Sequence, residues 1–368
     1  MKIALVTEYY YPDVGGMPEC VHNLARGLKA RGHEPVIITG NFGSDDFDMD
    51  RPARIIRLGR STVFFSNGSV SRASVGWRLG GRMRELLAQE KFDLIHVHNP
   101  LFPTLPYLAI KHAPTGSALV GTLHTYFDSG IVRMISNILS GYLDALDGVT
   151  AVSDSAGQSV RRYFDCRYQV IPNGVDLDWC TSGRRLDAYD DGRVNFLFLG
   201  RLEPRNEVPQ LLAAFAEARR EGPPMRLILL GDGPERADLQ RMVPDDARGE
   251  VVFTGTVLGG RPDYFATADV YCFTTRIGAL PISLLEGMAA GLPVIAPAIE
   301  PVRTLLQDGV QGRLTPLDHP ERFAEAMVEL ASDEIARRRM GQAARLAVEP
   351  LAWPKVVDQY LRAYDEVL

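Results

Sequence analysis

The stretch KIALVTEYYYPDVGGMPECVHNLARGLKARGHEPVIITG, residues 2–40, decides the fold class of this chain. It begins with the β-rich run KIALVTE and ends with a second such run, EPVIITG. Between them Val21, Leu24 and Leu28 recur at the spacing of an amphipathic helix, and Gly32 stands where a helix cap belongs. Strand, helix and strand in this order form the βαβ unit of a parallel sheet, so the sequence predicts an α/β protein.

The same alternation continues along the chain in two halves. In the first half we expect strands at 2–8, 34–40, 53–58, 94–98, 118–124, 148–153 and 168–173. In the second half we expect strands at 194–200, 225–231, 251–255, 269–274 and 293–297, with helices at 209–221, 234–243 and 282–291. The strands of the second half are continuous apolar runs, which are typical of a sheet covered on both faces.

A polar interval without periodicity, residues 176–193, separates the halves and is interpreted as an interdomain linker. A chain of 368 residues also exceeds the ordinary size of one domain. We therefore expect a Rossmann-like domain at 1–180, a second at 190–350, and a final helix at 352–368 that packs back on the first. Two doubly wound domains facing across a cleft would bind ligands at the carboxyl ends of their strands.

The composition narrows the class of protein. A net charge of −6 and a pI near 5.7 argue against a dedicated nucleic-acid binder. The four cysteines lack metal-ligand spacing, which favours a reducing compartment over a disulfide or zinc scaffold. No apolar run approaches the roughly 20 residues of a spanning helix, and the N-terminal run is too short for a secretory signal. We expect a cytoplasmic protein with at most peripheral membrane contact.

Three strand-to-helix turns carry glycine: YYPDVGGMPE, LGRLEPRNE and LGDGPERA. Glycine allows close approach of a ligand, and a following helix offers unpaired N–H groups to a phosphate. Together with Arg201, directly after a strand, these turns favour an anionic ligand such as a nucleoside diphosphate. The Walker and dinucleotide glycine patterns are absent. Residues 46–50 contain two D-x-D matches, which we interpret as a solvated loop; no metal is assigned.

The order and spacing of these motifs resemble the retaining glycosyltransferases of family 4, which have the two-domain GT-B architecture. The matching segments span almost the whole chain and include PDVGGMPECVHNLARGLKARGHEPVIIT, FDLIHVHNP, VGTLHTYF, VIPNGVD, FLFLGRLEPRN, LLGDGP and LLEGMAAGLPVIA. The resemblance implies transfer of a hexose from a nucleotide sugar with retention at the anomeric carbon. It also implies no cofactor and no essential metal.

The resemblance assigns donor-binding roles to particular residues. Gly15 and Gly16 would bring backbone amides to the donor diphosphate, and Arg201 would contact the same group. His124 would lie beside the donor sugar. His124 and Arg201 are the two residues expected to act in catalysis. Glu286 would accept hydrogen bonds from the ribose hydroxyls, for which a carboxylate is suited.

The chain also departs from the family pattern within the donor site. Gly278 stands where relatives usually carry a glutamate, and Asn206 stands where they carry a lysine. Arg205 or Arg276 would then have to supply the missing positive charge. Pro281 replaces a glycine and removes a backbone donor, and Ile282 follows it in the same expected site. These positions leave the identity of the donor sugar open.

The segment 51–91 is basic although the protein is acidic. It contains nine basic residues and two acidic ones: Arg51, Arg54, Arg57, Arg60, Arg72, Arg78, Arg82, Arg84 and Lys91, against Glu85 and Glu90. Within it GWRLGGRMRELLAQEK mixes apolar and basic residues in a pattern compatible with a helix on anionic lipid. The alternative is an ordinary surface helix whose apolar stripe faces the core, since Gly80 and Gly81 weaken the helix.

Just before that helix, FFSNGSVSR resembles the acceptor loop of the bacterial phosphatidylinositol mannosyltransferases. Asn67, Ser69 and Arg72 would then hold the phosphate and hydroxyls of an inositol phospholipid, and Asp13 would face its inositol. A solvated loop with an Asn-Gly turn is the competing interpretation.

We therefore expect a retaining glycosyltransferase that passes a hexose, best assigned as mannose from GDP-mannose, to a lipid-linked or polyol acceptor such as phosphatidylinositol. A nucleotide-sugar epimerase of the same architecture is one alternative. A catalytically decayed binding or accessory protein is another, motivated by Gly278, Asn206 and Pro281. The expected partners are the nucleotide sugar, the acceptor and an anionic membrane surface at the inner face of the plasma membrane, and not nucleic acid.

Overall fold

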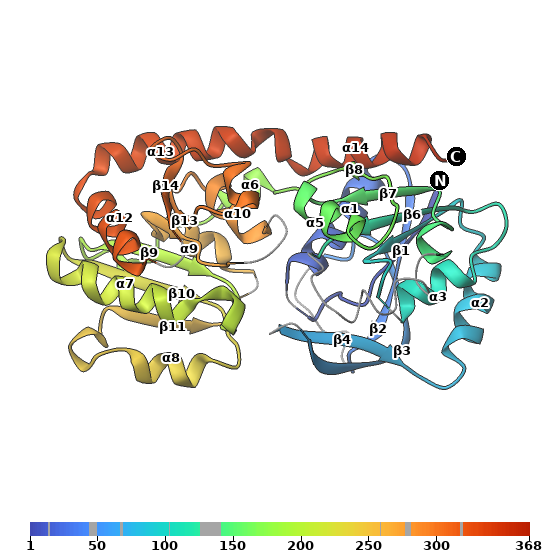
Figure 1. Ribbon diagram of the computed structural model, residues 1–368, viewed down its shortest axis with the longest axis horizontal. Coiled ribbons are helices and arrows are strands. Elements are labelled where there is room, and N and C mark those ends of the chain that lie inside the picture. The colour runs from blue at the N-terminus through green and yellow to red at the C-terminus, as the bar shows by residue number, and fades with distance from the viewer. Residues whose placement is uncertain are drawn as a thin grey trace. The chain divides into compact units, whose positions relative to one another are not determined.

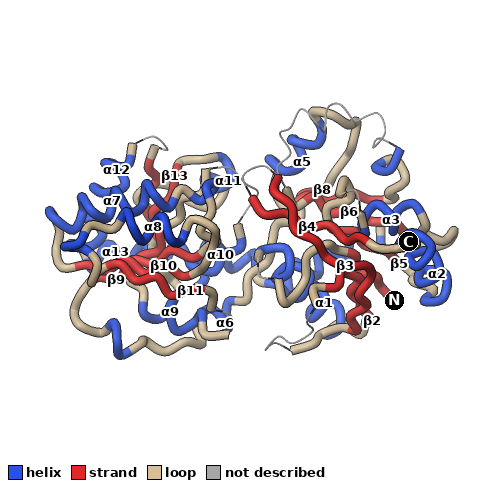
Figure 2. The backbone as a smooth tube through the Cα atoms, turned by 90° about the horizontal axis from the view of Figure 1, so that it is seen from below, coloured by secondary structure: helices blue, strands red, loops and turns tan. Residues whose placement is uncertain are grey.

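The computed structural model describes residues 1–13, 15–43, 50–66, 69–102, 104–125, 141–257, 259–276, 281–316 and 319–368. The chain divides into two compact units. The first contains Met1–Gly174 and Trp353–Leu368, and the second contains Val175–Ile277 and Pro281–Ala352. Each unit has one mostly parallel sheet with helices packed on it (Figures 1 and 2). The predicted α/β class is therefore confirmed.

The sheet of the first unit has eight strands in the order β4-β3-β2-β1-β5-β6-β7-β8, and the pair β3/β4 is its antiparallel one. Its strands are β1 (Lys2–Val6), β2 (Glu34–Asn41), β3 (Arg54–Ser66), β4 (Ser69–Val75), β5 (Leu94–His98), β6 (Ala118–Leu123), β7 (Gly148–Ala151) and β8 (Gln169–Val170). Its helices are α1 (Gly16–Ala30), α2 (Leu79–Glu90), α3 (Leu105–Lys111), α5 (Asp154–Arg161) and α14 (Trp353–Asp365). The strand expected at 168–173 is real but is only two residues long.

The hairpin β3/β4 brings strand structure into the segment that resembles the acceptor loop. In its antiparallel register Phe65 lies opposite Val70 and Ser66 lies opposite Ser69, so regular strand flanks positions 67 and 68 on both sides. The sequence prediction ended the strand at 58 and was wrong there. An Asn-Gly pair between β-rich runs is a strong hairpin signal that would have predicted these strands.

Helix α2 buries its apolar stripe in the core of the first unit. Leu79, Met83 and Leu87 are buried and pack with residues of β1, β2 and β5. The alternative of an ordinary surface helix is therefore the correct one for this stripe. Trp77, just before the helix, is the exception, because 88% of its surface is exposed.

The C-terminal helix α14 packs on α1 within the first unit (Figure 1). Gly27 of α1 permits the close approach, since a Cβ there would lie 2.3 Å from a methyl group of Val357. Arg31 then donates from Nε to the Asp358 carboxylate at 2.6 Å. The apolar side of α14 supplies Tyr360 and Tyr364 to the core.

The sheet of the second unit has six strands in the order β11-β10-β9-β12-β13-β14, all paired in parallel. Its strands are β9 (Val194–Leu199), β10 (Met225–Leu230), β11 (Val251–Gly255), β12 (Val270–Cys272), β13 (Val294–Pro297) and β14 (Gly312–Thr315). Its longer helices are α7 (Val208–Glu221), α8 (Arg236–Met242), α9 (Arg261–Thr267), α10 (Ile282–Ala289), α12 (Pro320–Ser332) and α13 (Glu334–Val348). Strand β14 was not predicted.

The expected linker contains regular structure that belongs to the second unit. Short helices α6 (Leu177–Cys180) and η1 (Asp187–Tyr189) lie within it, and α6 packs against α9 and α10. The Asp176 side chain caps α6 by accepting a hydrogen bond from the Trp179 N–H at 3.0 Å. The polar residues of this interval therefore serve helix caps and turns of the second unit as well as the connection between the units.

Candidate active site

The N-terminus of α1 carries the two glycines predicted to approach a diphosphate. Gly15 is the residue before the helix and has an extended backbone, and Gly16 is its first, exposed residue. Within the described residues no side chain caps this end of the helix. Its first N–H groups and the helix dipole therefore favour an anion.

The first unit brings together two of the predicted acceptor residues. Arg72 of β4 donates from Nε to the Asp13 carboxylate at 2.9 Å, and both side chains are largely buried. The Arg72 backbone N–H donates to the Tyr9 hydroxyl at 3.1 Å. The guanidinium groups of Arg72 and Arg57 both lie over the Phe42 ring, at 5.1 and 5.3 Å from its centroid. Tyr9, Phe42 and Arg57 were not predicted.

Two other acceptor residues cannot be placed in this group. Asn67 lies outside the described residues. The backbone of Ser69 belongs to β4, but its side chain also lies outside the described part of the chain. Both therefore remain predictions.

His124 directly follows β6 and packs against a second histidine. Its Nε2 lies 2.8 Å from Nδ1 of His98, the last residue of β5, and the two rings stack with centroids 5.1 Å apart. Burial lowers the pKa of His124 to about 3 and holds the pKa of His98 well below its ordinary value. Both rings are therefore neutral near pH 7.

A further buried network runs beneath these rings to the C-terminal helix. His96 lies 2.8 Å from the Tyr364 hydroxyl and 2.6 Å from the Thr122 hydroxyl, which in turn lies 2.6 Å from that of Thr150. The His96 and His98 rings have centroids 4.3 Å apart. The carboxyl ends of β5 and β6 are thereby tied to α14.

In the second unit a buried carboxylate organises the predicted diphosphate arginines. Glu203 has only 1% of its side chain exposed, and it accepts from Arg205 Nε at 2.5 Å and from Arg201 Nε at 3.3 Å. Gly231 and Gly233 allow the next loop to approach, because a Cβ there would lie 2.0 and 2.3 Å from backbone oxygens of the Arg201 loop. The turn glycines thus have a packing role.

Asn206, which replaces the usual lysine, is used to hold two loops together. Its side-chain N–H donates to the Arg201 carbonyl at 2.7 Å, and its Oδ1 accepts from Thr275 at 2.8 Å. Arg276 pairs with Glu207 at 3.5 Å. Among the expected substitutes for the lysine, Arg205 therefore lies beside Arg201 on a shared carboxylate, whereas Arg276 pairs with another one.

Glu286 lies in α10 and has a basic partner that the sequence did not predict. Its carboxylate is 3.2 Å from Arg261 Nη1, and both side chains are at most 10% exposed. The Arg261 guanidinium also lies 4.6 Å from the centroid of the Trp179 ring. Pro281 precedes the helix and Ile282 begins it, while Gly278 lies outside the described residues. Arg261 is 25 residues away in sequence, so only tertiary structure reveals the pair.

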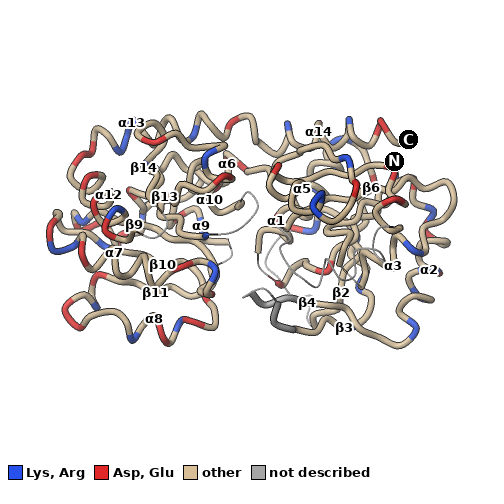
Figure 3. Tube along the Cα trace, viewed as in Figure 1, with Lys and Arg blue, Asp and Glu red and all other residues tan. Residues whose placement is uncertain are grey.

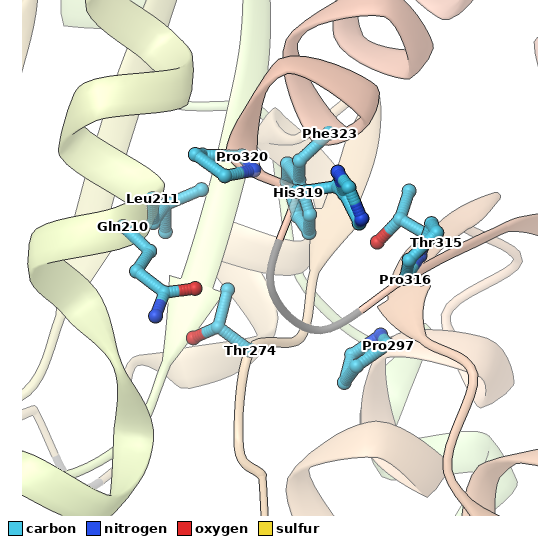
Figure 4. Close-up of a pocket in the computed structure, with 9 residues that line it drawn as sticks. All are labelled: Gln210, Leu211, Thr274, Pro297, Thr315, Pro316, His319, Pro320 and Phe323. Carbon is cyan, nitrogen blue, oxygen red and sulfur yellow. The ribbon is translucent and has the colours of Figure 1, made fainter.

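A small, partly open pocket lies at the carboxyl ends of β12, β13 and β14, where about 330 Å³ of empty space includes open solvent (Figure 4). It is lined by Gln210, Leu211, Thr274, Pro297, Thr315, Pro316, His319, Pro320 and Phe323. None of the predicted site residues lines it. The pocket fits the expectation that the carboxyl edge of a parallel sheet is hollowed, but not the expected residues.

The described residues contain neither a metal-binding cluster nor a membrane-spanning helix. Over those residues no group of three or more His, Cys, Asp or Glu side chains is arranged to hold a metal ion. No helix of the described chain has the length and apolar character required to span a bilayer.

Comparison with known proteins connects both units to one enzyme class. Residues 14–179 match the model of Glycosyltransferase Family 4, and residues 193–333 match that of Glycosyl transferases group 1. The chain is 30% identical over 375 residues to the phosphatidyl-myo-inositol mannosyltransferase of Mycobacterium tuberculosis (strain CDC 1551 / Oshkosh), covering 100% of this chain and 97% of the relative.

Two further proteins complete the comparison. A GDP-mannose-dependent alpha-mannosyltransferase of Mycolicibacterium smegmatis is 28% identical over 384 residues, covering 100% of this chain and 98% of the relative. The crystal structure of Anabaena Alr3699/HepE in complex with UDP superposes with a TM-score of 0.78 at 17% identity, covering 99% of this chain and 100% of that one.

Proposed function

The chain belongs to glycosyltransferase family 4 and has the GT-B fold, and from this premise we propose that this hexosyltransferase moves mannose from GDP-mannose to phosphatidylinositol. The names of two relatives support this choice of donor and acceptor. The observation that carries the proposal is the pair formed by Arg72 and Asp13. These two residues are 59 positions apart in sequence, and their ion pair supports assigning both to one acceptor site.

The pair has the chemistry needed for an inositol phospholipid. Arg72 supplies a planar guanidinium whose remaining N–H groups can donate to a phosphodiester. Asp13 holds that guanidinium in place and can accept from an inositol hydroxyl. The stacked Phe42 ring restricts Arg72 further, so little side-chain entropy is lost when the phosphate binds.

In the second unit we assign Arg201, Arg205 and Glu286 to the donor. Glu203 fixes the two arginines by their Nε atoms, which directs the guanidinium groups without occupying all of their donors. Glu286 accepts from the ribose hydroxyls, and Arg261 keeps its carboxylate oriented. Asn206 serves this site indirectly, by tying the Arg201 loop to the segment that contains Thr275.

The proposed reaction is a front-face displacement with retention. The acceptor hydroxyl attacks the anomeric carbon while the bond from that carbon to the diphosphate oxygen breaks. The hydroxyl proton passes to the departing phosphate oxygen, so no separate carboxylate base is needed. Arg201 and Arg205 stabilise the negative charge that develops on the diphosphate. Neutral His124 offers a hydrogen bond to the donor sugar.

We also propose peripheral contact with an anionic membrane. Because α2 buries its apolar stripe, the contact is assigned to the exposed Trp77, just before the helix, rather than to the helix itself. Arg78 directly follows Trp77 in sequence, and Figure 3 shows further basic positions along α2. Exposed aromatic and basic side chains together suit the headgroup region of a bilayer.

Calorimetric titration with nucleotide sugars tests the donor assignment. We expect GDP-mannose to bind more tightly than UDP-glucose or UDP-N-acetylglucosamine, and Arg201→Ala to weaken binding of GDP-mannose by about 10- to 100-fold. Arg167→Ala, an exposed arginine of the first unit, is the matched control. Tighter binding of a UDP-sugar would overturn the choice of GDP-mannose, and absence of any binding would overturn the enzyme proposal.

A further inference from the structure

His98 and His124, at the ends of β5 and β6, form a pair in which one ring nitrogen of His98 lacks a hydrogen-bond partner among the described residues. His98 is fully buried, its Nδ1 lies 2.8 Å from His124 Nε2, and its Nε2 has no hydrogen-bond partner within the described structure. Each neutral imidazole carries one N–H and one acceptor nitrogen. The short contact between the two rings therefore allows two tautomeric arrangements.

The two arrangements differ in what is left unpaired in the core. If His124 donated from Nε2, His98 would have to carry its own proton on Nε2, as a buried N–H without an acceptor. If His98 donates from Nδ1, its Nε2 is left as an unprotonated lone pair. An unpaired buried N–H group is the rarer and more costly situation in proteins. The second arrangement is therefore favoured.

We propose that His98 is a positioning residue that donates from Nδ1–H to His124 Nε2 and so holds His124 as the Nδ1–H tautomer. In this tautomer His124 presents a hydrogen-bond donor, rather than an acceptor, on the side of its ring away from His98. Over the described residues, His98 is the hydrogen-bond partner of the His124 ring. The inference deepens the proposed function, since it rests on His124 facing the donor sugar.

The residue next to His98 holds the backbone of the same histidine. Asn99 adopts the left-handed conformation with φ of 56°, and its Oδ1 accepts from the His124 backbone N–H at 2.8 Å. Its side-chain N–H donates to the Thr125 hydroxyl at 3.0 Å. His98 thus fixes the ring and Asn99 the main chain, so neither the position nor the tautomer of His124 depends on the substrate.

Nitrogen-15 NMR of the histidine side chains tests the tautomer without reference to activity. The full chain with ¹⁵N-labelled histidine has seven imidazoles, and a His124→Gln sample assigns the signal of interest. We expect the wild-type His124 to show a protonated Nδ1 and an unprotonated Nε2. The reversed pattern, or an average of the two, would overturn the proposal whatever the enzyme transfers.

Kinetics with three substitutions tests the functional consequence. His98→Leu should lower kcat/KM for GDP-mannose about 10-fold, the effect of one hydrogen bond, while the affinity for GDP, which lacks the sugar, stays within about twofold. His98→Asn places an amide near the former Nδ1 and should restore much of the loss. His98→Gln places it near the former Nε2 and should not. His112→Asn, outside the cluster, is the control.

The outcomes separate this inference from the proposed function. Equal losses in GDP affinity and in kcat/KM would indicate a purely structural role for His98 and overturn the inference. Equal rescue by Asn and Gln would do the same. If instead the NMR pattern is as expected but His124→Gln leaves transfer unchanged, the positioning stands and the assignment of His124 to the sugar fails.

Discussion

Arg72 and Asp13, which lie 59 positions apart in sequence, form a 2.9 Å ion pair at the carboxyl side of the first unit's sheet. The side chains are 24% and 15% exposed, so the pair is shielded yet open to a ligand. Arg72 also stacks on Phe42, which limits its rotamers. A guanidinium restrained in this way suits recognition of a phosphate.

Arg72→Ala should therefore impair use of the lipid acceptor more than use of the donor. Loss of a charge-assisted hydrogen bond to phosphate predicts an increase of about 10- to 100-fold in KM for phosphatidylinositol. The KM for GDP-mannose in slow donor hydrolysis should change little. Arg167→Ala should leave both values unchanged. An equal rise in both KM values would contradict the acceptor assignment.

The buried pair of Glu286 and Arg261 predicts a stability effect in the second unit. Glu286→Gln removes the negative charge that faces the largely buried Arg261 guanidinium, which should lower the free energy of unfolding by about 3 kcal/mol. Replacing both residues, as Arg261→Met with Glu286→Leu, should cost less than the sum of the two single changes. Urea unfolding of the wild type, Arg261→Met, Glu286→Leu and the double variant measures this coupling; strict additivity would count against the pair.

The buried histidines predict a loss of stability in acid. Burial lowers the pKa of His96 to about 3 and that of His98 well below its ordinary value of 6.5. As the pH falls, these histidines take up protons in the unfolded chain before they do so in the folded protein. Their contribution to the free energy of unfolding is therefore fully present above pH 6.5 and is lost as the pH falls from there toward 3. Each histidine contributes about 1.4 kcal/mol to the loss at pH 5.5.

His98→Asn removes one of these groups and isolates its share. The difference in unfolding free energy between pH 7.5 and pH 5.5 should be smaller in the variant than in the wild type by about 1.4 kcal/mol. Arg167→Ala, at an exposed position that holds no histidine, is the control. An identical pH dependence in wild type and His98→Asn would show that His98 is protonated equally in the folded and the unfolded protein, which would contradict this prediction.

Trp77 provides the test of membrane contact. Of its surface 88% is exposed, and Val75, two positions earlier, is 48% exposed. Trp77→Ser should weaken sedimentation with phosphatidylinositol-containing vesicles about 10-fold, because an aromatic ring gains most at the bilayer interface. Ile335→Ser removes a similarly exposed apolar side chain, 82% exposed, from the second unit and should have no effect. Equal loss for both would mean nonspecific adsorption.

Much of the fold was predictable because hydrophobic periodicity is local. The βαβ pattern of residues 2–40 and the apolar runs after 193 correctly predict β1, α1, β2, β9 and β10. The hairpin β3/β4 was missed because the segment around its signal, Asn67-Gly68, was interpreted as an acceptor loop or a solvated loop. Strand β14 has four residues, two of them only partly buried, which give too short a pattern to recognise.

The sequence proposes the main residues of the site, and the structure adds their partners. Local sequence motifs identify five of the proposed residues: Asp13, Arg72, His124, Arg201 and Glu286. Their neighbours are set by tertiary structure: Arg261 reaches Glu286 from α9, and His98 reaches His124 from the adjacent strand. Such pairs join segments 25 or more residues apart, so no local sequence pattern predicts them.

The most direct test of the proposed function is a transfer assay with GDP-mannose and vesicles that contain phosphatidylinositol. Mass spectrometry of the lipid should show one added hexose, and α-mannosidase should remove it, as retention at the anomeric carbon requires. Arg201→Ala and Arg72→Ala should each reduce the product at least about 10-fold, whereas Arg167→Ala should not. Absence of the mannolipid from an enzyme that binds GDP-mannose, or transfer only from a UDP-sugar, would contradict the proposal.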